Sequence, residues 1–428
     1  MAPAQASQPE SAPAPEPESE SAPVTEPEQT TNDVEWRFAW DDAPTYEMWV
    51  LTPGLQKGDK LGIVKDLGLV GRIGASLFVD YGFVSGDGIG NSWDIELRRL
   101  RIETTGRFSY GLDTLYKFSF GGEDGRLYLN DFWFAWQPSE WVQRVRFGYL
   151  DPPFSLQALT SSTERSFMEA AAPVAAFAPG YRLGLEARDR YVDPFDVSWI
   201  ASLSSVGQSQ QFSDASDSPF RASLRTAWRP GGVSDDPNVP LTHVAMSLGY
   251  SFSGTGVVHY RARPESSLAP YLVDTGDISG DAFQVGLEFA RRQGPVTLQA
   301  EWMGSFVSST DFGSLFFSGG YAELAWALTG EVRPYDARSA LFIPSAPKNP
   351  FSWERQSIGG LEVAARIAYL DLTDRGLRGG RMLTLNASSI WAFNRFFRLH
   401  FDSIYADVKD RPSHENDFIV QMRIELTL

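Results

Sequence analysis

Residues 148–184 read GYLDPPFSLQALTSSTERSFMEAAAPVAAFAPGYRLG and show no strand-like alternation of apolar and polar side chains. Segments that do alternate adjoin this stretch on both sides, at residues 142–151 and 182–190. Irregular connections of about thirty residues are uncommon in compact folds and are usually functional or disordered. Because this one is rich in Phe, Ala, Leu and Met, we expect it to pack against other parts of the chain.

Period-two alternation runs through most of the chain after residue 68. In residues 142–150, Val145 and Phe147 lie on one face of the expected strand, and Arg144 and Arg146 lie on the other. About seventeen such segments of ten-odd residues can be counted, whereas bacterial single-chain barrels contain an even number of strands. The pattern is typical of an all-β, antiparallel transmembrane barrel with apolar side chains outside and polar side chains inside.

Composition favours a membrane barrel over helical spans. The chain is 43% hydrophobic and 13% aromatic, yet it contains no run of about eighteen apolar residues, which a membrane helix needs. Lipid accepts only helices and closed barrels. A soluble antiparallel sandwich also alternates, and its wet outer face would tolerate the charges that recur on strand after strand. Alternation alone therefore leaves a soluble β fold open.

The opening stretch carries a block that resembles the phosphate-selective porin family of the bacterial outer membrane. Further blocks that match the family follow in order at residues 260–276 (YRARPESSLAPYLVDTG), 318–335 (SGGYAELAWALTGEVRPY) and 359–372 (GGLEVAARIAYLDL). The resemblance covers residues 36–428. Matching positions in the first block are Gly148, Pro153, Phe154, Leu156, Leu159 to Ser162, Phe167 to Glu169, Ala178 to Gly180, Arg182 and Gly184.

This resemblance implies a barrel of sixteen strands. If the first clear strand starts on the periplasmic side, residues 142–151 form the fifth strand, and the stretch after it is the third outer loop. In porins that loop folds inward and narrows the channel. The resemblance also implies that Arg98 and Arg99, in the motif Glu96-Leu-Arg-Arg-Leu-Arg101, contribute to an anion path. Strand alternation instead places Arg99 in the lumen and Arg98 on the opposite face.

Charge and composition separate residues 1–35 from the barrel domain, residues 36–428. The first segment consists mainly of Pro, Glu, Ser and Ala, so it buries too little apolar surface to fold, and we expect a disordered tail. The tail accounts for −8 of the formal charge of −17, which leaves −9 for the barrel domain.

The sequence lacks features of two other classes of protein. It shows no stripe of basic residues, which a nucleic-acid-binding protein would need. It also has no Cys that could form disulfides or thiolate metal sites.

The chain contains 31 Arg and only 6 Lys, and alternation places many of these cations on the lumen side. Such a lumen attracts anions, and guanidinium groups suit carboxylate or phosphate. The alternative is that lumen charges of both signs pair with each other. Acids available for pairing are Glu96, Asp131, Glu186, Glu288, Glu301, Glu323 and Glu362. The predicted pore-lining residues are Arg99, Arg101, Arg107, Lys117, Arg144, Arg146, Arg182, Arg188, Arg221 and Arg225.

Within residues 152–179, the charged residues Glu164, Arg165 and Glu169 are predicted to face the pore as part of a constriction loop. No HExxH, GxSxG or phosphate-binding loop motif occurs in the sequence. We therefore expect no enzyme activity, no cofactor and no metal site. The residues expected to hold this loop against the barrel wall are Phe154, Leu156, Phe167, Met168 and Phe177.

Together these features predict an outer-membrane porin that passes small hydrophilic solutes by diffusion, with a bias toward anions such as phosphate. We expect a homotrimer in contact with lipid and lipopolysaccharide. Two alternatives stay open from the sequence. One is a structural barrel that tethers the outer membrane to the cell wall through residues 1–35, and the other is a sheath for electron-carrying haem proteins. Conductance in a planar bilayer separates a porin from a tether, which would instead bind peptidoglycan.

Overall fold

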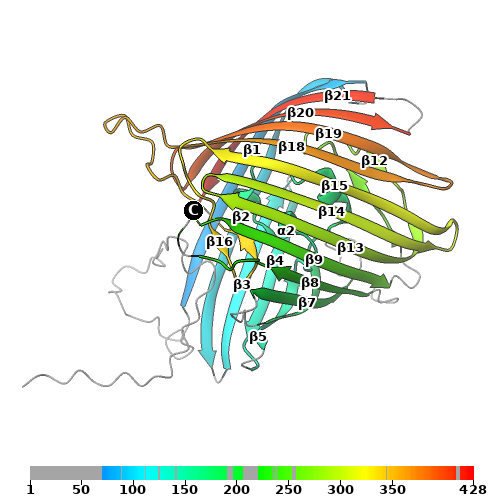
Figure 1. Ribbon diagram of the computed structural model, residues 1–428, viewed down its shortest axis with the longest axis horizontal. Helices are drawn as coiled ribbons and strands as arrows, with labels where there is room; N and C mark the ends of the chain where they lie inside the picture. Colours follow the sequence, from blue (N-terminus) through cyan, green and yellow to red (C-terminus); the bar gives the residue numbers. More distant parts are fainter. Residues whose placement is uncertain are drawn as a thin grey trace, which may run out of the picture. The chain divides into compact units, whose positions relative to one another are not determined.

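The computed structural model describes residues 70–87, 89–110, 112–123, 126–139, 142–189, 196–205, 220–234, 236, 239–252, 257–343, 345–410 and 415–428. The predicted tail, residues 1–35, lies outside the described residues, as do residues 36–69. Figure 1 shows long strands that run side by side through the described part of the chain.

A single sheet of 17 strands contains all the long strands of the described residues. One of them, β10 (Val257–Val258), is only two residues long. The sixteen others are β1 (Val70–Gly86), β2 (Gly90–Tyr110), β3 (Leu112–Glu123), β4 (Arg126–Trp136), β5 (Val142–Leu150), β6 (Arg182–Asp189), β7 (Val197–Ser205), β8 (Phe220–Trp228), β9 (Leu241–Phe252), β13 (Ile278–Gln293), β14 (Val296–Ser309), β15 (Gly313–Ala327), β18 (Gly360–Asp374), β19 (Leu377–Ala392), β20 (Phe397–Lys409) and β21 (Glu415–Thr427).

These sixteen strands close into a barrel. Each pairs antiparallel with its neighbours along the chain, and β1 pairs with β21 as well as with β2. At this seam, Asp80 of β1 lies opposite Arg423 of β21. The Nε and Nη2 groups of Arg423 each donate to one carboxylate oxygen of Asp80 at 2.7 Å. The closed antiparallel barrel confirms the predicted fold class.

The barrel carries apolar side chains outside and polar side chains inside. In β8, Leu224 and Trp228 are 40% and 50% exposed, whereas Arg221 and Arg225 are 4% and 1% exposed. A soluble sandwich would bury the first pair and expose the second, because water solvates its polar face. The observed pattern therefore excludes the soluble β fold and matches a barrel whose outer belt faces lipid.

Three long connections join the strands at the two ends of the barrel. Antiparallel order places residues 151–181, which we call the inner segment, and the β9–β13 connection, described over residues 257–277, at one end, the loop end. The β15–β18 connection, residues 328–359, leaves the opposite or terminal end, where β1 begins and β21 ends. Besides β10, the short strands within the last two connections are β11 (Arg261–Ala262), β12 (Val273–Asp274), β16 (Tyr335–Asp336) and β17 (Leu341–Phe342).

The inner segment forms short helices, because its proline and serine residues provide local start signals. Ser155 caps α2 (Leu156–Leu159) by accepting a hydrogen bond from the Ala158 N–H at 3.1 Å. Pro173 lies in the first turn of α3 (Ala172–Phe177), where a missing N–H costs nothing. Between them lies the 3₁₀ turn η1 (Ser162–Glu164). No helix within the described ranges has the length and apolar character needed to cross a membrane.

The register of β1 against β2 corrects the predicted position of Arg98. Phe78 lies opposite Arg99, but Asp80 lies opposite Glu96, so β2 has one extra residue in this interval. Such a β-bulge interrupts the period-two alternation. Both Arg98 and Arg99 consequently contact the inner segment inside the barrel. The prediction that Arg98 lies on the outer face was wrong, because simple alternation does not account for a bulge.

The seam pair leads to a prediction about barrel stability. Replacing Asp80 with Leu removes the bidentate partner of the buried Arg423 and leaves Glu169 as its remaining anionic partner, so we expect the free energy of unfolding to fall by about 2–5 kcal/mol. The loss is measured as a lower unfolding midpoint in urea. Unfolding is detected by the difference in gel mobility between folded and unfolded monomer. Arg381→Met is the matched control, since Arg381 is 43% exposed in its pairs with Asp371 and Asp410; we expect about 0–1 kcal/mol there. Equal losses in both variants would contradict a stabilising role of the seam pair.

Candidate functional site in the barrel interior

The inner segment crosses the interior of the barrel, because it contacts strands on different sides of the ring. Glu301 of β14 accepts hydrogen bonds from the backbone N–H groups of Leu156 at 3.1 Å and Gln157 at 2.8 Å. Asp402 of β20 accepts one from the Met168 N–H at 2.9 Å. Both carboxylates are buried, and these hydrogen bonds direct their oxygens at the peptide N–H groups of the segment.

A third buried carboxylate joins the inner segment to the β9–β13 connection. Glu265 of that connection accepts a hydrogen bond from the Ala172 N–H at 2.9 Å. It also accepts from Arg366 Nε at 2.9 Å, Asn386 Nδ2 at 2.6 Å and Thr384 Oγ1 at 2.9 Å, all on the wall strands β18 and β19. Glu265 is 3% exposed, so this network fixes both connections to the same part of the wall.

Glu169, one of the three predicted loop charges, lies between two arginines of the wall. Its carboxylate accepts from Arg98 Nε at 2.9 Å and from Arg423 Nη2 at 2.8 Å. Burial opposes ionisation, but the two guanidinium groups outweigh it and hold the pKa of Glu169 well below its usual range. Glu169 is therefore an anionic anchor, and it links the segment to the seam pair through Arg423.

The second predicted loop charge, Arg165, organises the segment itself. Its guanidinium donates to the carbonyl oxygens of Gln157 at 3.1 Å, Ala158 at 3.3 Å and Thr160 at 3.3 Å. These carbonyls lie at the C-terminal part of α2, where a cation is favourable. Arg165 also lines a small cavity on the terminal side of the segment.

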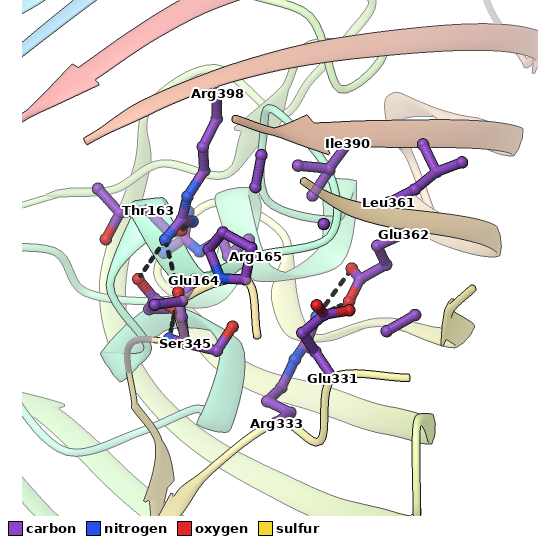
Figure 2. Close-up of a pocket in the computed structure, with 15 residues that line it drawn as sticks. Thr163, Glu164, Arg165, Glu331, Arg333, Ser345, Leu361, Glu362, Ile390 and Arg398 are labelled. Atoms are coloured by element: carbon purple, nitrogen blue, oxygen red, sulfur yellow. Dashed lines mark hydrogen bonds and ion pairs between the residues drawn. The ribbon is translucent and has the colours of Figure 1, made fainter. Parts of the chain in front are cut away.

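Figure 2 shows this cavity, of about 60 Å³, between the inner segment and the β15–β18 connection. Glu164, the third predicted loop charge, accepts from the Ser345 N–H at 3.1 Å, and its carboxylate lies 3.7 Å from Arg398 Nη2. Burial raises the pKa of Glu164, and Arg398 opposes this increase. On the other side of the cavity, Arg333 donates to Glu362 at 3.0 Å. The contacts of Glu164 with Ser345 and Arg398 join the inner segment to the terminal end of the barrel.

Apolar side chains complete the attachment of the inner segment. Phe154 and Phe177 belong to one buried cluster with Met303 and Phe317 of the wall. The five apolar residues predicted to hold the loop against the wall are all buried: Phe154, Leu156, Phe167, Met168 and Phe177.

Several predicted pore-lining cations form ion pairs. Arg146 donates to Glu186 through two nitrogens, and Arg188 Nη2 lies 3.6 Å from the same carboxylate. Arg225 Nη2 lies 2.8 Å from Glu288. Lys117 Nζ lies 3.0 Å from Asp131. For these four cations the structure agrees with the alternative that lumen charges pair with each other.

Three other predicted arginines have neutral partners. Arg99 donates to Ser162 Oγ of the inner segment. Arg221 donates to Ser223 at 3.0 Å, Ser251 at 2.9 Å and Gln284 at 2.5 Å. Arg182 donates to the adjacent Tyr181 carbonyl at 2.8 Å. Within the described residues, no carboxylate lies within ion-pair distance of Arg99, Arg182 or Arg221.

The remaining predicted arginines differ in exposure. Arg144 is buried, with its Cζ 5.7 Å from the centre of the Trp133 ring. Arg101 is half-buried on β2, and Arg107 is exposed farther along the same strand. The ten predicted cations thus lie on five strands, β2, β3, β5, β6 and β8, and they differ in whether they form ion pairs.

A cavity of about 520 Å³, which we call the vestibule, lies at the loop end between the inner segment and the β9–β13 connection. Arg98 and Arg182 line it, together with Arg261 and Arg263. Arg261 and Arg263 were not among the predicted pore-lining residues, because they lie in a connection without alternation. The available signal was the Arg-x-Arg spacing ten residues before Tyr271. No group of His, Asp and Glu suited to a metal ion occurs in the described part of the chain.

Comparison with known proteins agrees with the barrel fold. The family model for phosphate-selective porin O and P matches residues 72–428. Porin O of Pseudomonas aeruginosa is 26% identical over 258 residues, which cover 54% of this chain and 55% of that protein.

Two solved structures share the fold at 10% sequence identity. The anion-selective porin from Comamonas acidovorans has a TM-score of 0.54, with 84% of this chain and all of that chain covered. The trimer form of OmpT from Vibrio cholerae has a TM-score of 0.52, with 83% and 99% covered. The family match, which spans all sixteen barrel strands except the first two residues of β1, gives the assignment: the chain belongs to the phosphate-selective porin O and P family and is a β-barrel porin of the bacterial outer membrane.

Proposed function

We propose that this porin prefers small anions to cations and that the inner segment narrows its pathway. The observation that carries the proposal is the set of interior arginines without a carboxylate partner among the described residues: Arg99, Arg182, Arg221, Arg261 and Arg263. Unneutralised guanidinium groups on a low-dielectric wall raise the local concentration of anions. Arg also offers planar, paired donors that suit phosphate and carboxylate.

The net negative charge of the chain does not oppose this preference. Glu301, Asp402 and Glu265 direct their oxygens at backbone N–H groups of the inner segment. Glu186 and Glu288 are paired with arginines. These carboxylates are occupied by the protein itself, so they attract permeating cations less than their number suggests.

The proposal includes the assembly and surroundings of the barrel. The trimer form of a protein with the same fold supports a homotrimer, and the apolar outer belt supports contact with lipid and lipopolysaccharide. We assign the barrel transport and no catalysis. The role of residues 1–35, including contact with the cell wall, lies outside the described residues; we propose that the barrel conducts without them.

Shortening the inner segment tests whether it narrows the pathway. Removing residues 161–173 deletes η1 and the contacts of Ser162, Glu164 and Glu169, so we expect single-channel conductance to rise severalfold. The control is an equally long deletion of residues 1–13, for which we expect no change. Heat-resistant oligomers on a gel establish that each variant is folded. A folded 161–173 deletion with the conductance of the unmodified channel would show that the segment does not limit the current.

Removing charge from arginines with neutral partners tests the anion preference. In Arg99→Gln/Arg182→Gln, we expect the reversal potential in a KCl gradient to shift toward cations. The shift should shrink in concentrated salt, since the Debye length falls from about 10 Å at 0.1 M to about 3 Å at 1 M. Arg225→Gln/Glu288→Gln is the matched control, because it removes one charge of each sign and should leave the potential unchanged. Equal shifts in both variants would mean that carboxylate pairing does not determine which arginines act on ions.

A further inference from the structure

We propose that the vestibule binds organic anions that carry an aromatic ring, such as aromatic carboxylates, in preference to inorganic phosphate. This inference rests on the proposed anion preference and specifies the class of solute. The vestibule encloses about 520 Å³, which lies in the range of about 300–1,000 Å³ typical of sites for small organic ligands. An inorganic phosphate ion has only five non-hydrogen atoms and fills a small part of this space, in which one water molecule takes up about 30 Å³.

One part of the vestibule holds two guanidinium groups in a fixed arrangement. The Cζ atoms of Arg261 and Arg263 lie 4.1 Å and 4.9 Å from the centre of the Tyr271 ring. Arg263 also donates to the Ser267 carbonyl. Stacking on one ring restricts the orientation of both planar groups. Since neither forms an ion pair within the described residues, their charge is available to a bound carboxylate.

Residues from a different part of the chain add rings beside another arginine. Tyr149 of β5 and Tyr181 of the inner segment stack with their ring centres 5.9 Å apart and an angle of 22° between planes. Both line the vestibule, and so does Arg182, which follows Tyr181 in the chain. Tyrosine faces next to a guanidinium group suit a ligand that combines an aromatic ring with a negative charge.

Acidic residues of the vestibule are largely occupied. Glu169 is paired with Arg98 and Arg423, and Glu265 is paired with Arg366. Glu96 also lines the cavity, and it too has an interaction partner within the protein. The arrangement thus combines arginines that lack carboxylate partners with aromatic surface, a combination that a site for inorganic phosphate does not need.

The test is block of the chloride current through single channels by three probe anions: benzoate, cyclohexanecarboxylate and inorganic phosphate. Benzoate and cyclohexanecarboxylate have the same charge and similar size, but only benzoate is aromatic. We expect benzoate to block at the lowest concentration, because only it both stacks on tyrosine and bridges to arginine. Equal block by all three anions, or stronger block by phosphate, would overturn the proposal.

Variants locate the block within the vestibule. Arg261→Gln/Arg263→Gln should raise the half-blocking benzoate concentration about tenfold, and Tyr181→Leu should reduce benzoate block to the level of cyclohexanecarboxylate. Arg381→Gln, an exposed arginine paired with Asp371 and Asp410, is the control and should change neither. Benzoate block that persists unchanged in the double variant would overturn the proposal. A channel that conducts chloride without block contradicts this inference alone, whereas absence of any conductance contradicts the proposed function as well.

Discussion

Hydrogen bonds from backbone N–H groups of the inner segment to buried carboxylates of the barrel interior are the interactions on which the site depends. Glu301, Asp402 and Glu265 each accept at least one such bond from the segment. A buried carboxylate without partners would be very costly, and an irregular segment inside a barrel has peptide groups that need partners. The N–H groups of the segment supply the hydrogen bonds that the carboxylates need, and the carboxylates accept the hydrogen bonds that the N–H groups need. These bonds hold the segment in the interior.

This arrangement has a consequence for the electrostatics of the pathway. Carboxylates that accept peptide N–H groups, or that pair with Arg146, Arg225 and Arg366, are used in holding the structure together. In the function that we propose, the arginines that remain with neutral partners, such as Arg182 and Arg221, supply the positive potential that favours anions. Net charge therefore gives little information about selectivity, which depends on where each charge finds its partner.

The strand architecture was largely predictable from the sequence, because membrane-facing strands impose a strict period of two. Residues such as Leu224 and Arg225 show the expected contrast in exposure. The place of β5 as the fifth strand, followed by a long irregular connection, was also predicted correctly. The face of β2 on which Arg98 lies was predicted wrongly, since a bulge in β2 shifts the alternation. A bulge leaves no clear signal in one sequence.

The interior was harder to predict, because its contacts join residues that lie far apart in the chain. Glu265 and Ala172, or Glu164 and Ser345, are brought together only by the closed barrel. Arg261 and Arg263 lie in a connection without periodicity, so alternation gave no reason to select them. Sequence did identify many of the interior cations, but it could not separate those with carboxylate partners, such as Arg225, from those with neutral partners, such as Arg221.

The most direct test of the account is the sign of the reversal potential of the unmodified porin in a tenfold KCl gradient across a planar bilayer. The barrel domain carries a formal charge of −9, so a channel governed by net charge would prefer potassium. If carboxylates are occupied and arginines with neutral partners line the pathway, the potential has the sign of chloride permeation. A potential with the sign of potassium permeation would contradict the account.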